Sequence, residues 1–303
     1  MAYWVEAMRT MAAIIGVHGI MNQQSGRHQL IAEWGPALAD GIERAAGSPV
    51  PVPGLDIVFY GDLFLPDRSG AAAKGPADEP AGLTDEDAIT LGAFAEELTG
   101  APGSGPPPGT DLPSKGRTSV PLALQPILRA LDGRLGSRQA SLLFLGELKQ
   151  VRRYLLDPAI KAEADERAAS VIVPDARVVI GHSLGSVVAF EFIRQHPAYR
   201  VDLLLTLGSP LGLRTVRALM PDPAYRIGGM PPNIARWVSL RDPRDPVACS
   251  GDLSRLWPGV SDDGTVDNQS DAHSVCRYLG KRQTGRAVLE TMPDLADQSF
   301  DDS

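Results

Sequence analysis

The chain contains very little cysteine. Cys249 and Cys276 are the only two cysteines among 303 residues, and neither belongs to a C-x-x-C pair or to a cluster of cysteine and histidine. A disulfide framework needs a larger, even set of cysteines, and a structural zinc site needs four cysteine and histidine ligands. The sequence therefore predicts two free thiols and no metal site.

Positive charge is also scarce. Lys and Arg together number 29 against 37 Asp and Glu, which gives a formal net charge of −8, and no stretch is rich in Lys and Arg. Surfaces that follow the phosphates of a nucleic acid concentrate basic residues on one face. We therefore expect no nucleic-acid partner.

Long apolar runs are absent. The most apolar stretch, residues 178–193, is interrupted by His182, Ser183 and Glu191, so no segment has the length of apolar sequence that crosses a bilayer. Residues 1–15 contain no Lys and no small-residue cleavage site after an apolar core, which argues against a secretory signal. With 43% hydrophobic residues the chain can bury a sizeable core. We expect a cytoplasmic protein without a transmembrane segment.

The most informative stretch is residues 175–195, DARVVIGHSLGSVVAFEFIRQ. An apolar β-branched run, the pentapeptide G-H-S-L-G and a run with helical periodicity predict a strand, a tight turn and a helix. The two glycines allow the sharp turn, and Ser183 would stand at the helix N-terminus, where negative charge is stabilised. The alternative is an ordinary turn in which Ser183 only caps the helix.

This pattern resembles the nucleophile elbow of the serine hydrolases in the α/β-hydrolase superfamily. The resemblance implies an α/β-hydrolase fold, with a mostly parallel central sheet flanked by helices, and Ser183 as the nucleophile. The rest of the chain agrees with an α/β class, because strand and helix patterns alternate. Strands are predicted at residues 11–17, 55–60, 201–208 and 235–240, and a helix at residues 29–46.

A His-Gly dipeptide follows the first predicted strand. In the resembled family the residue after such a dipeptide, here Ile20, contributes one backbone N–H to the oxyanion hole, and the residue after the nucleophile, here Leu184, contributes the other. Gly19 would let the backbone come close. We interpret His18 as a turn residue that orients this loop.

Two further residues are expected to support the site. His182 adjoins the nucleophile, and Ser209 lies in L-T-L-G-S-P-L-G, which is similar to a pattern of lipases and esterases. Ser209 would then line the substrate site near Ser183. An ordinary turn explains it equally well.

A serine nucleophile needs a base, and the resembled fold supplies its triad in the chain order Ser, acid, His. His196 lies at the end of the helix after Ser183, about 20 Å away along that helix. His273, in a polar loop, remains as the base. Three histidines lie too early in the chain for this order: His18, His28 and His182.

The acid should follow the strand at residues 235–240. Asp245, which stands before Pro-Val, fits the family's position best, and Asp242 is the alternative acid. Both could instead belong to a surface turn with local ion pairs.

The chain is expected to form a single domain over residues 1–303, with an insertion at residues 62–136. Pro- and Gly-rich runs in the insertion cannot pack a core, and they surround helical patterns at residues 83–98 and 122–135. We interpret the insertion as a mobile cap over the site, and the alternative is an idle insertion.

Outside the insertion, residues 141–148 are expected to precede a helix at residues 151–169 that is interrupted at Pro158 and has a solvated, charge-paired face. Near the end of the chain we expect one last helix. A frayed acidic tail is then expected at residues 293–303.

These features together predict a serine hydrolase that cleaves a carboxylic ester, an esterase or lipase-like enzyme acting on a small-molecule acyl ester. A thioesterase or an acyltransferase could use the same triad. A non-catalytic binding protein could keep the fold without turnover. The chemistry requires no metal and no organic cofactor, and the oligomeric state is left open.

Overall fold

The computed structural model describes residues 14–65, 92–94, 96–97, 131–133, 136–174, 176–248 and 252–297. At its centre lies a sheet of 6 strands in the order β2-β1-β3-β4-β5-β6, and every neighbouring pair is parallel. This confirms the predicted α/β class with a parallel sheet. The strands are β1 (Ile14–Val17), β2 (Leu55–Val58), β3 (Val178–His182), β4 (Val201–Leu207), β5 (Ile234–Arg241) and β6 (Val260–Thr265).

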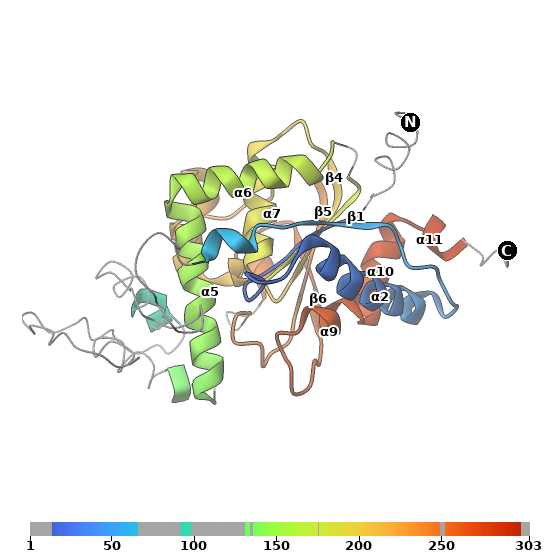
Figure 1. Cartoon of the computed structure of the whole chain (residues 1–303), viewed down its shortest axis with the longest axis horizontal. Helices are drawn as coiled ribbons and strands as arrows, with labels where there is room; N and C mark the ends of the chain where they lie inside the picture. Colours follow the sequence, from blue (N-terminus) through green and yellow to red (C-terminus); the bar gives the residue numbers. More distant parts are fainter. Residues whose placement is uncertain are drawn as a thin grey trace, which may run out of the picture.

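Helices cover both faces of the sheet (Figure 1). One face carries α5 (Arg138–Leu156), α6 (Pro158–Val171) and α7 (Leu184–Gln195). The other carries α2 (Arg27–Ala46), α9 (Val275–Leu279), α10 (Arg282–Thr291) and α11 (Asp294–Asp297). Short connecting helices are η1 (Gly61–Phe64), η3 (Pro210–Gly212), α8 (Arg214–Ala218), η4 (Pro223–Arg226) and η5 (Leu253–Arg255).

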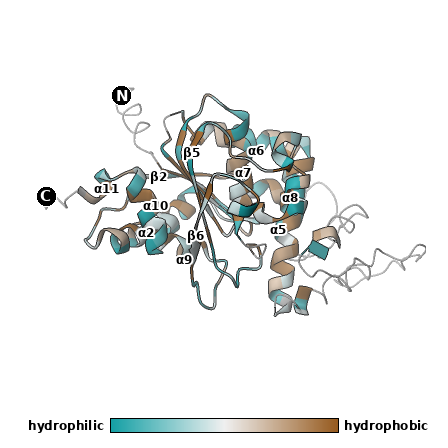
Figure 2. Ribbon diagram, turned by 180° about the vertical axis from the view of Figure 1, so that it is seen from behind, coloured by the Kyte–Doolittle hydropathy of each residue, from teal (hydrophilic) through white to brown (hydrophobic). Residues whose placement is uncertain are grey.

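The sheet separates two hydrophobic cores. Side chains alternate along a strand, so Val179 packs toward α5, α6 and α7 while Val178 and Ile180 pack toward α2 and α10. The central strands are coloured mostly as hydrophobic, whereas the helices carry both hydrophobic and hydrophilic residues (Figure 2). A sheet buried on both faces explains the uninterrupted apolar runs in the sequence.

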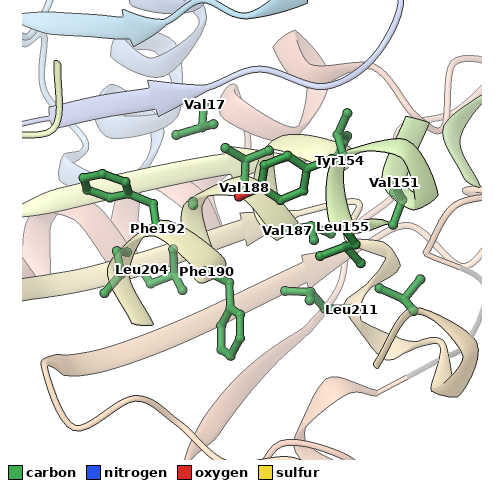
Figure 3. Packing of buried hydrophobic residues seen from close by; sticks show 14 of the residues in the cluster. Val17, Val151, Tyr154, Leu155, Val187, Val188, Phe190, Phe192, Leu204 and Leu211 are labelled. Carbon is green, nitrogen blue, oxygen red and sulfur yellow. The ribbon is translucent and has the colours of Figure 1, made fainter. Parts of the chain in front are cut away.

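The first core is built largely between α5 and α7. Figure 3 shows Val151 and Tyr154 of α5 near Val187 and Val188 of α7, and all four side chains are buried. Residues three or four apart on a helix share a face, so Val151 and Tyr154 mark the buried side of α5. The same side of α5 reaches the functional site described below.

The predicted interruption of the helical stretch at Pro158 is confirmed, but the helix before it starts earlier than predicted. Residues 141–148 do not precede a separate helix but belong to α5, which runs unbroken from Arg138 to Leu156. Asp157 then accepts hydrogen bonds from the N–H groups of Ala159 and Ile160, and Pro158 begins α6. The break therefore falls between two helices, at the residues that favour a helix start.

Two other elements differ from the sequence prediction. Strand β6 was not predicted, because its sequence VSDDGT has no apolar alternation. It lies at the edge of the sheet, where a strand pairs with a neighbour on one side only. Residues 294–297, expected in the frayed tail, form α11 and bury Leu295, while residues 298–303 lie outside the described part of the chain.

Most of the insertion at residues 62–136 lies outside the described residues, including the greater part of both predicted helices. Its described pieces contact the domain: Phe94 and Leu131 are fully buried in the first core. Glu97 accepts hydrogen bonds from the N–H groups of Arg214 and Thr215 at the start of α8. Within the described residues, no helix combines the length and the apolar character needed to cross a membrane.

Candidate active site

The carboxyl ends of β1 and β3 define the location of the site. After β1 the chain continues to β2 on one side of β1, whereas β3 to β6 extend on the other side. In open parallel sheets, ligands bind at the carboxyl ends of the strands where the order reverses in this way. His18 follows β1, Ser183 follows β3, and Asp245 lies in the loop after β5.

Ser183 occupies a strained turn between β3 and α7. Its φ of 56° and ψ of −128° are uncommon for a residue with a side chain, and such conformations persist only where neighbouring contacts hold them. The Ser183 N–H donates to Leu207 O at 3.0 Å, and Ser186 Oγ donates to Ser183 O at 2.6 Å. The strain is therefore supported from the adjacent strand and from within α7.

Two glycines make this turn possible. A Cβ at Gly185 would lie 2.0 Å from the carbonyl oxygen of Val17, and one at Gly181 would lie 2.5 Å from Cα of Ser186. Both distances are far below contact, so only glycine allows α7 to start this close to β1 and β3.

The structure brings Ser183, His273 and Asp245 together. Ser183 Oγ lies 2.8 Å from His273 Nε2, and His273 Nδ1 lies 2.8 Å and 2.9 Å from the two oxygens of Asp245. These residues come from three separate loops. Their contacts match the geometry of a nucleophile, a base and a carboxylate that orients the base.

The environment of His273 favours its protonated form. Burial alone would lower the pKa of this imidazole, but the carboxylate of Asp245, with a smaller effect of Glu147, raises it above the usual value. An imidazolium that forms at this position is therefore stabilised.

Asp245 is held by several donors. The carboxylate is fully buried and accepts from the Val247 N–H at 2.9 Å and from the Tyr278 hydroxyl at 2.8 Å. Gly208 has a φ of 57°, and a Cβ there would lie 2.6 Å from Asp245 Oδ2, so the backbone of Gly208 closes the other side. The carboxylate is therefore kept in place next to His273.

Asp242, the alternative acid, has a different role in the geometry. It accepts hydrogen bonds from the backbone N–H groups of Arg244 and Asn268, and within the described residues no hydrogen bond joins it to His273. These bonds and the Arg244 guanidinium lower the pKa of Asp242 against the opposing effect of burial. Asp242 thus ties the loop after β5 to the loop that carries His273.

His182 and His18 support the site as neutral imidazoles. His182 Nε2 donates to the carbonyl oxygen of His273 at 2.9 Å, and burial lowers the pKa of His182 well below its usual value. Burial also lowers the pKa of His18 to about 4, so the ring is neutral and has one donor and one acceptor nitrogen. Its Nδ1 donates to Gly19 O, and its Nε2 accepts from the Tyr60 N–H. The His182 imidazole fixes the loop that carries His273, and the His18 imidazole fixes the loop after β1.

The loop after β1 lies directly against Ser183. A Cβ on Gly19 would come within 2.6 Å of Ser183 Cβ, so the backbone approaches the serine as closely as glycine permits. Asn22 donates to the carbonyl oxygens of both Gly19 and Ile20, which turns the carbonyl groups of this loop toward Asn22. Leu184 is the first residue of α7, where N–H groups have no partner within the helix.

Ser209 lies in a turn. Its Oγ accepts from the Leu211 N–H at 3.2 Å and shares a hydrogen bond with Ser186 Oγ, and the side chain is buried. Through Ser186, which also donates to Ser183 O, the side chain of Ser209 is linked to the turn at Ser183.

Three residues of this region were not predicted from the sequence: Tyr278, Asn22 and Glu147. Glu147 had a detectable signal, because it shares a helical stripe with the apolar residues Phe144 and Val151. A charged residue on a buried stripe is unusual and often functional. The signal was lost because residues 141–148 were not assigned to a continuous helix.

Among the described residues, no three His, Cys, Asp or Glu side chains are grouped as a metal site would require. Of the two cysteines, Cys276 lies in the described part and is a free thiol. No protein-family model, no curated protein and no solved structure matches this chain. The fold and the contacts of the site therefore carry the functional assignment.

Proposed function

We propose that this protein is a serine hydrolase of the α/β-hydrolase type that cleaves a carboxylic ester through an acyl-enzyme. One observation carries the proposal: Ser183 Oγ lies 2.8 Å from His273 Nε2, and the other ring nitrogen of that histidine contacts Asp245 at 2.8 Å. The strained turn that presents Ser183 at the start of α7 supports the same conclusion.

In the first half of the reaction, His273 Nε2 takes the proton of Ser183 as its Oγ forms a bond to the ester carbonyl carbon. The carbonyl oxygen becomes an oxyanion, which the N–H groups of Ile20 and Leu184 would stabilise. The bond to the leaving alcohol then breaks, and His273 gives its proton to the alcohol oxygen. Asp245 stabilises the imidazolium throughout without taking its proton.

In the second half, water replaces the alcohol. His273 removes a proton from water as the water oxygen attacks the acyl carbon, and the second oxyanion forms in the same place. The bond to Ser183 Oγ breaks, the serine recovers its proton from His273, and a carboxylic acid leaves. An acyltransferase would differ only in replacing the water by another acceptor.

Covalent labelling tests the nucleophile. A fluorophosphonate probe should label the wild-type protein on Ser183, as located by mass spectrometry, and should leave Ser183→Ala unlabelled. Equal labelling of both proteins, or no labelling of either, would favour a binding protein that keeps the fold without turnover.

Ester hydrolysis tests the acid. With p-nitrophenyl esters of increasing chain length, Asp245→Asn should lower kcat by about 10⁴, as loss of the orienting carboxylate does in other triads. Asp242→Asn should cost much less, because Asp242 contacts the loops and not the base. The chain-length profile distinguishes an esterase from a lipase-like enzyme, and acyl-thioester substrates test the thioesterase alternative.

A further inference from the structure

Helix α5 places a carboxyl group next to the proposed nucleophile. Glu147 is fully buried. It lies one helical turn before Val151, whose side chain Figure 3 shows near α7. Its neighbour Gly146 faces the loop after β1, since a Cβ there would lie 3.9 Å from Ile20 Cδ1. The carboxyl group of Glu147 itself lies near the Ser183 hydroxyl and the Leu184 N–H, at the proposed oxyanion hole.

Glu147 has no hydrogen-bond partner that would explain its burial. Neither of its carboxyl oxygens makes a hydrogen bond of standard geometry within the described residues. The oxygens nevertheless lie close enough to the Ser183 hydroxyl and the Leu184 N–H to interact with both. A buried carboxyl without satisfied oxygens is costly, which points to a role other than stabilising the fold.

The position of Glu147 has a direct chemical consequence. The oxygen of a tetrahedral intermediate must lie about 3 Å from the Leu184 N–H, which is the region that the carboxyl of Glu147 faces. A carboxylate there would repel the oxyanion and compete with it for the same donor. A neutral carboxylic acid would instead present its own O–H as an additional donor.

On the basis of the proposed function, we infer that Glu147 is a further catalytic residue of the oxyanion hole: its carboxylic acid donates to the oxyanion, and its carboxylate repels it. Ionisation of Glu147 would accordingly switch the site off.

The surroundings of Glu147 allow both forms near neutral pH. Burial raises its pKa to about 7, and the nearby His273, the Ser183 hydroxyl and the Leu184 N–H oppose this only in part. Within the described residues, three titratable groups face it: His273 and Asp245 from the loops beyond β5, and Tyr60 from the loop after β2. His273 must be neutral to act as the base, so activity needs a neutral His273 together with a protonated Glu147.

The pH dependence of fluorophosphonate labelling tests the inference, because the phosphonyl oxygen occupies the oxyanion hole. In the wild type, the labelling rate of Ser183 should rise with the deprotonation of His273 and fall again above about pH 7. Glu147→Gln, which is neutral and keeps a donor, should lose the falling limb and label at least tenfold faster than the wild type at pH 9. Glu147→Leu should lose the falling limb too, but it should label about 100-fold more slowly than Glu147→Gln, because it has no donor.

Two controls separate the possible outcomes. Glu163→Gln changes the same chemical group at an exposed position of α6 and should reproduce the wild-type pH profile. Infrared difference spectroscopy should detect a protonated carboxyl in the wild type at pH 6 that disappears in Glu147→Gln. A profile that is the same in the wild type and Glu147→Gln would overturn the inference, and equal rates for the Gln and Leu variants would overturn the donor role. If Ser183 is unlabelled at every pH in the wild type and all variants, the proposed function itself fails, and the infrared signal still reports whether Glu147 titrates.

Discussion

The hydroxyl group of Tyr278 donates a hydrogen bond to Oδ2 of Asp245 at 2.8 Å. The same oxygen of Tyr278 accepts from the backbone N–H of Asp242 at 2.8 Å. Tyr278 belongs to α9, which begins two residues after His273. It therefore joins the loop that carries Asp242 and Asp245 to the helix that follows His273. Burial raises the pKa of its hydroxyl, so that it remains a donor at any ordinary pH.

Replacing this hydroxyl should weaken catalysis and the fold together. Tyr278→Phe removes a hydrogen bond to a charged group, which is worth about 1.5 kcal/mol, so kcat should fall about tenfold. The buried N–H of Asp242 loses its acceptor, which should cost about 1–3 kcal/mol of unfolding free energy in urea. Tyr154→Phe, which removes a hydroxyl bonded to Asp165 away from the site, should lower stability without lowering kcat.

The approach of Gly19 to Ser183 predicts a strong effect of one methyl group. Gly19→Ala would place a Cβ 2.6 Å from Ser183 Cβ, so the loop after β1 must move away from the nucleophile. If this loop supplies an oxyanion donor, kcat should fall by about 10²–10³.

A matched control for this variant lies in the same loop. A Cβ at Gly26 would meet no atom within 4 Å, so Gly26→Ala should keep full activity. Equal activities of the two variants, measured with a short p-nitrophenyl ester, would show that the close approach has no catalytic role.

Glu147 should make the stability of the protein depend on pH. Burial raises its pKa to about 7 in the folded state, above the value in the unfolded chain, so folding favours the protonated form. The contribution of Glu147 to the free energy of unfolding is complete below the pKa that this residue has in the unfolded chain. It decreases as the pH rises toward 7 and is lost above that value.

The neutral variant Glu147→Gln should therefore gain stability relative to the wild type between pH 5 and pH 8.5. The gain should be on the order of 3 kcal/mol in urea unfolding, and most of it should appear by pH 7. A constant difference between the two proteins over this range would contradict a raised pKa.

The buried ion pair of α7 should matter for folding and not for chemistry. Arg194 binds both oxygens of the fully buried Glu191, with the shorter contact at 2.7 Å. Arg194→Ala leaves that carboxylate with Lys161 at 3.7 Å, so the unfolding free energy should fall by about 3 kcal/mol.

An exposed pair provides the comparison. Asp40 and Arg44 are both more than half exposed on α2, so Asp40→Ala should cost less than about 1 kcal/mol. Esterase activity per folded molecule should be unchanged in both variants. A loss of kcat in Arg194→Ala with its fold intact would assign α7 a role that its contacts do not indicate.

Local sequence patterns were sufficient for most strands and for the turn at Ser183. A central strand buried on both faces must be continuously apolar, and a tight turn that bears a side chain at positive φ must be flanked by glycine, so both features are visible in the sequence. Strand β6 lacked such a pattern because an edge strand tolerates polar residues, and its pairing with β5 depends on the rest of the sheet.

The sequence by itself determined the alternation of strands and helices, the strained position of Ser183 and the loop in which His273 lies, because each depends on neighbouring residues in the chain. Only the tertiary structure decided that Asp245, rather than Asp242, contacts His273, and that Glu147 of α5 lies beside Ser183 and the Leu184 N–H. Loops far apart in the chain meet only because parallel strands bring their carboxyl ends to one edge of the sheet, and no spacing between residues encodes which side chains then touch.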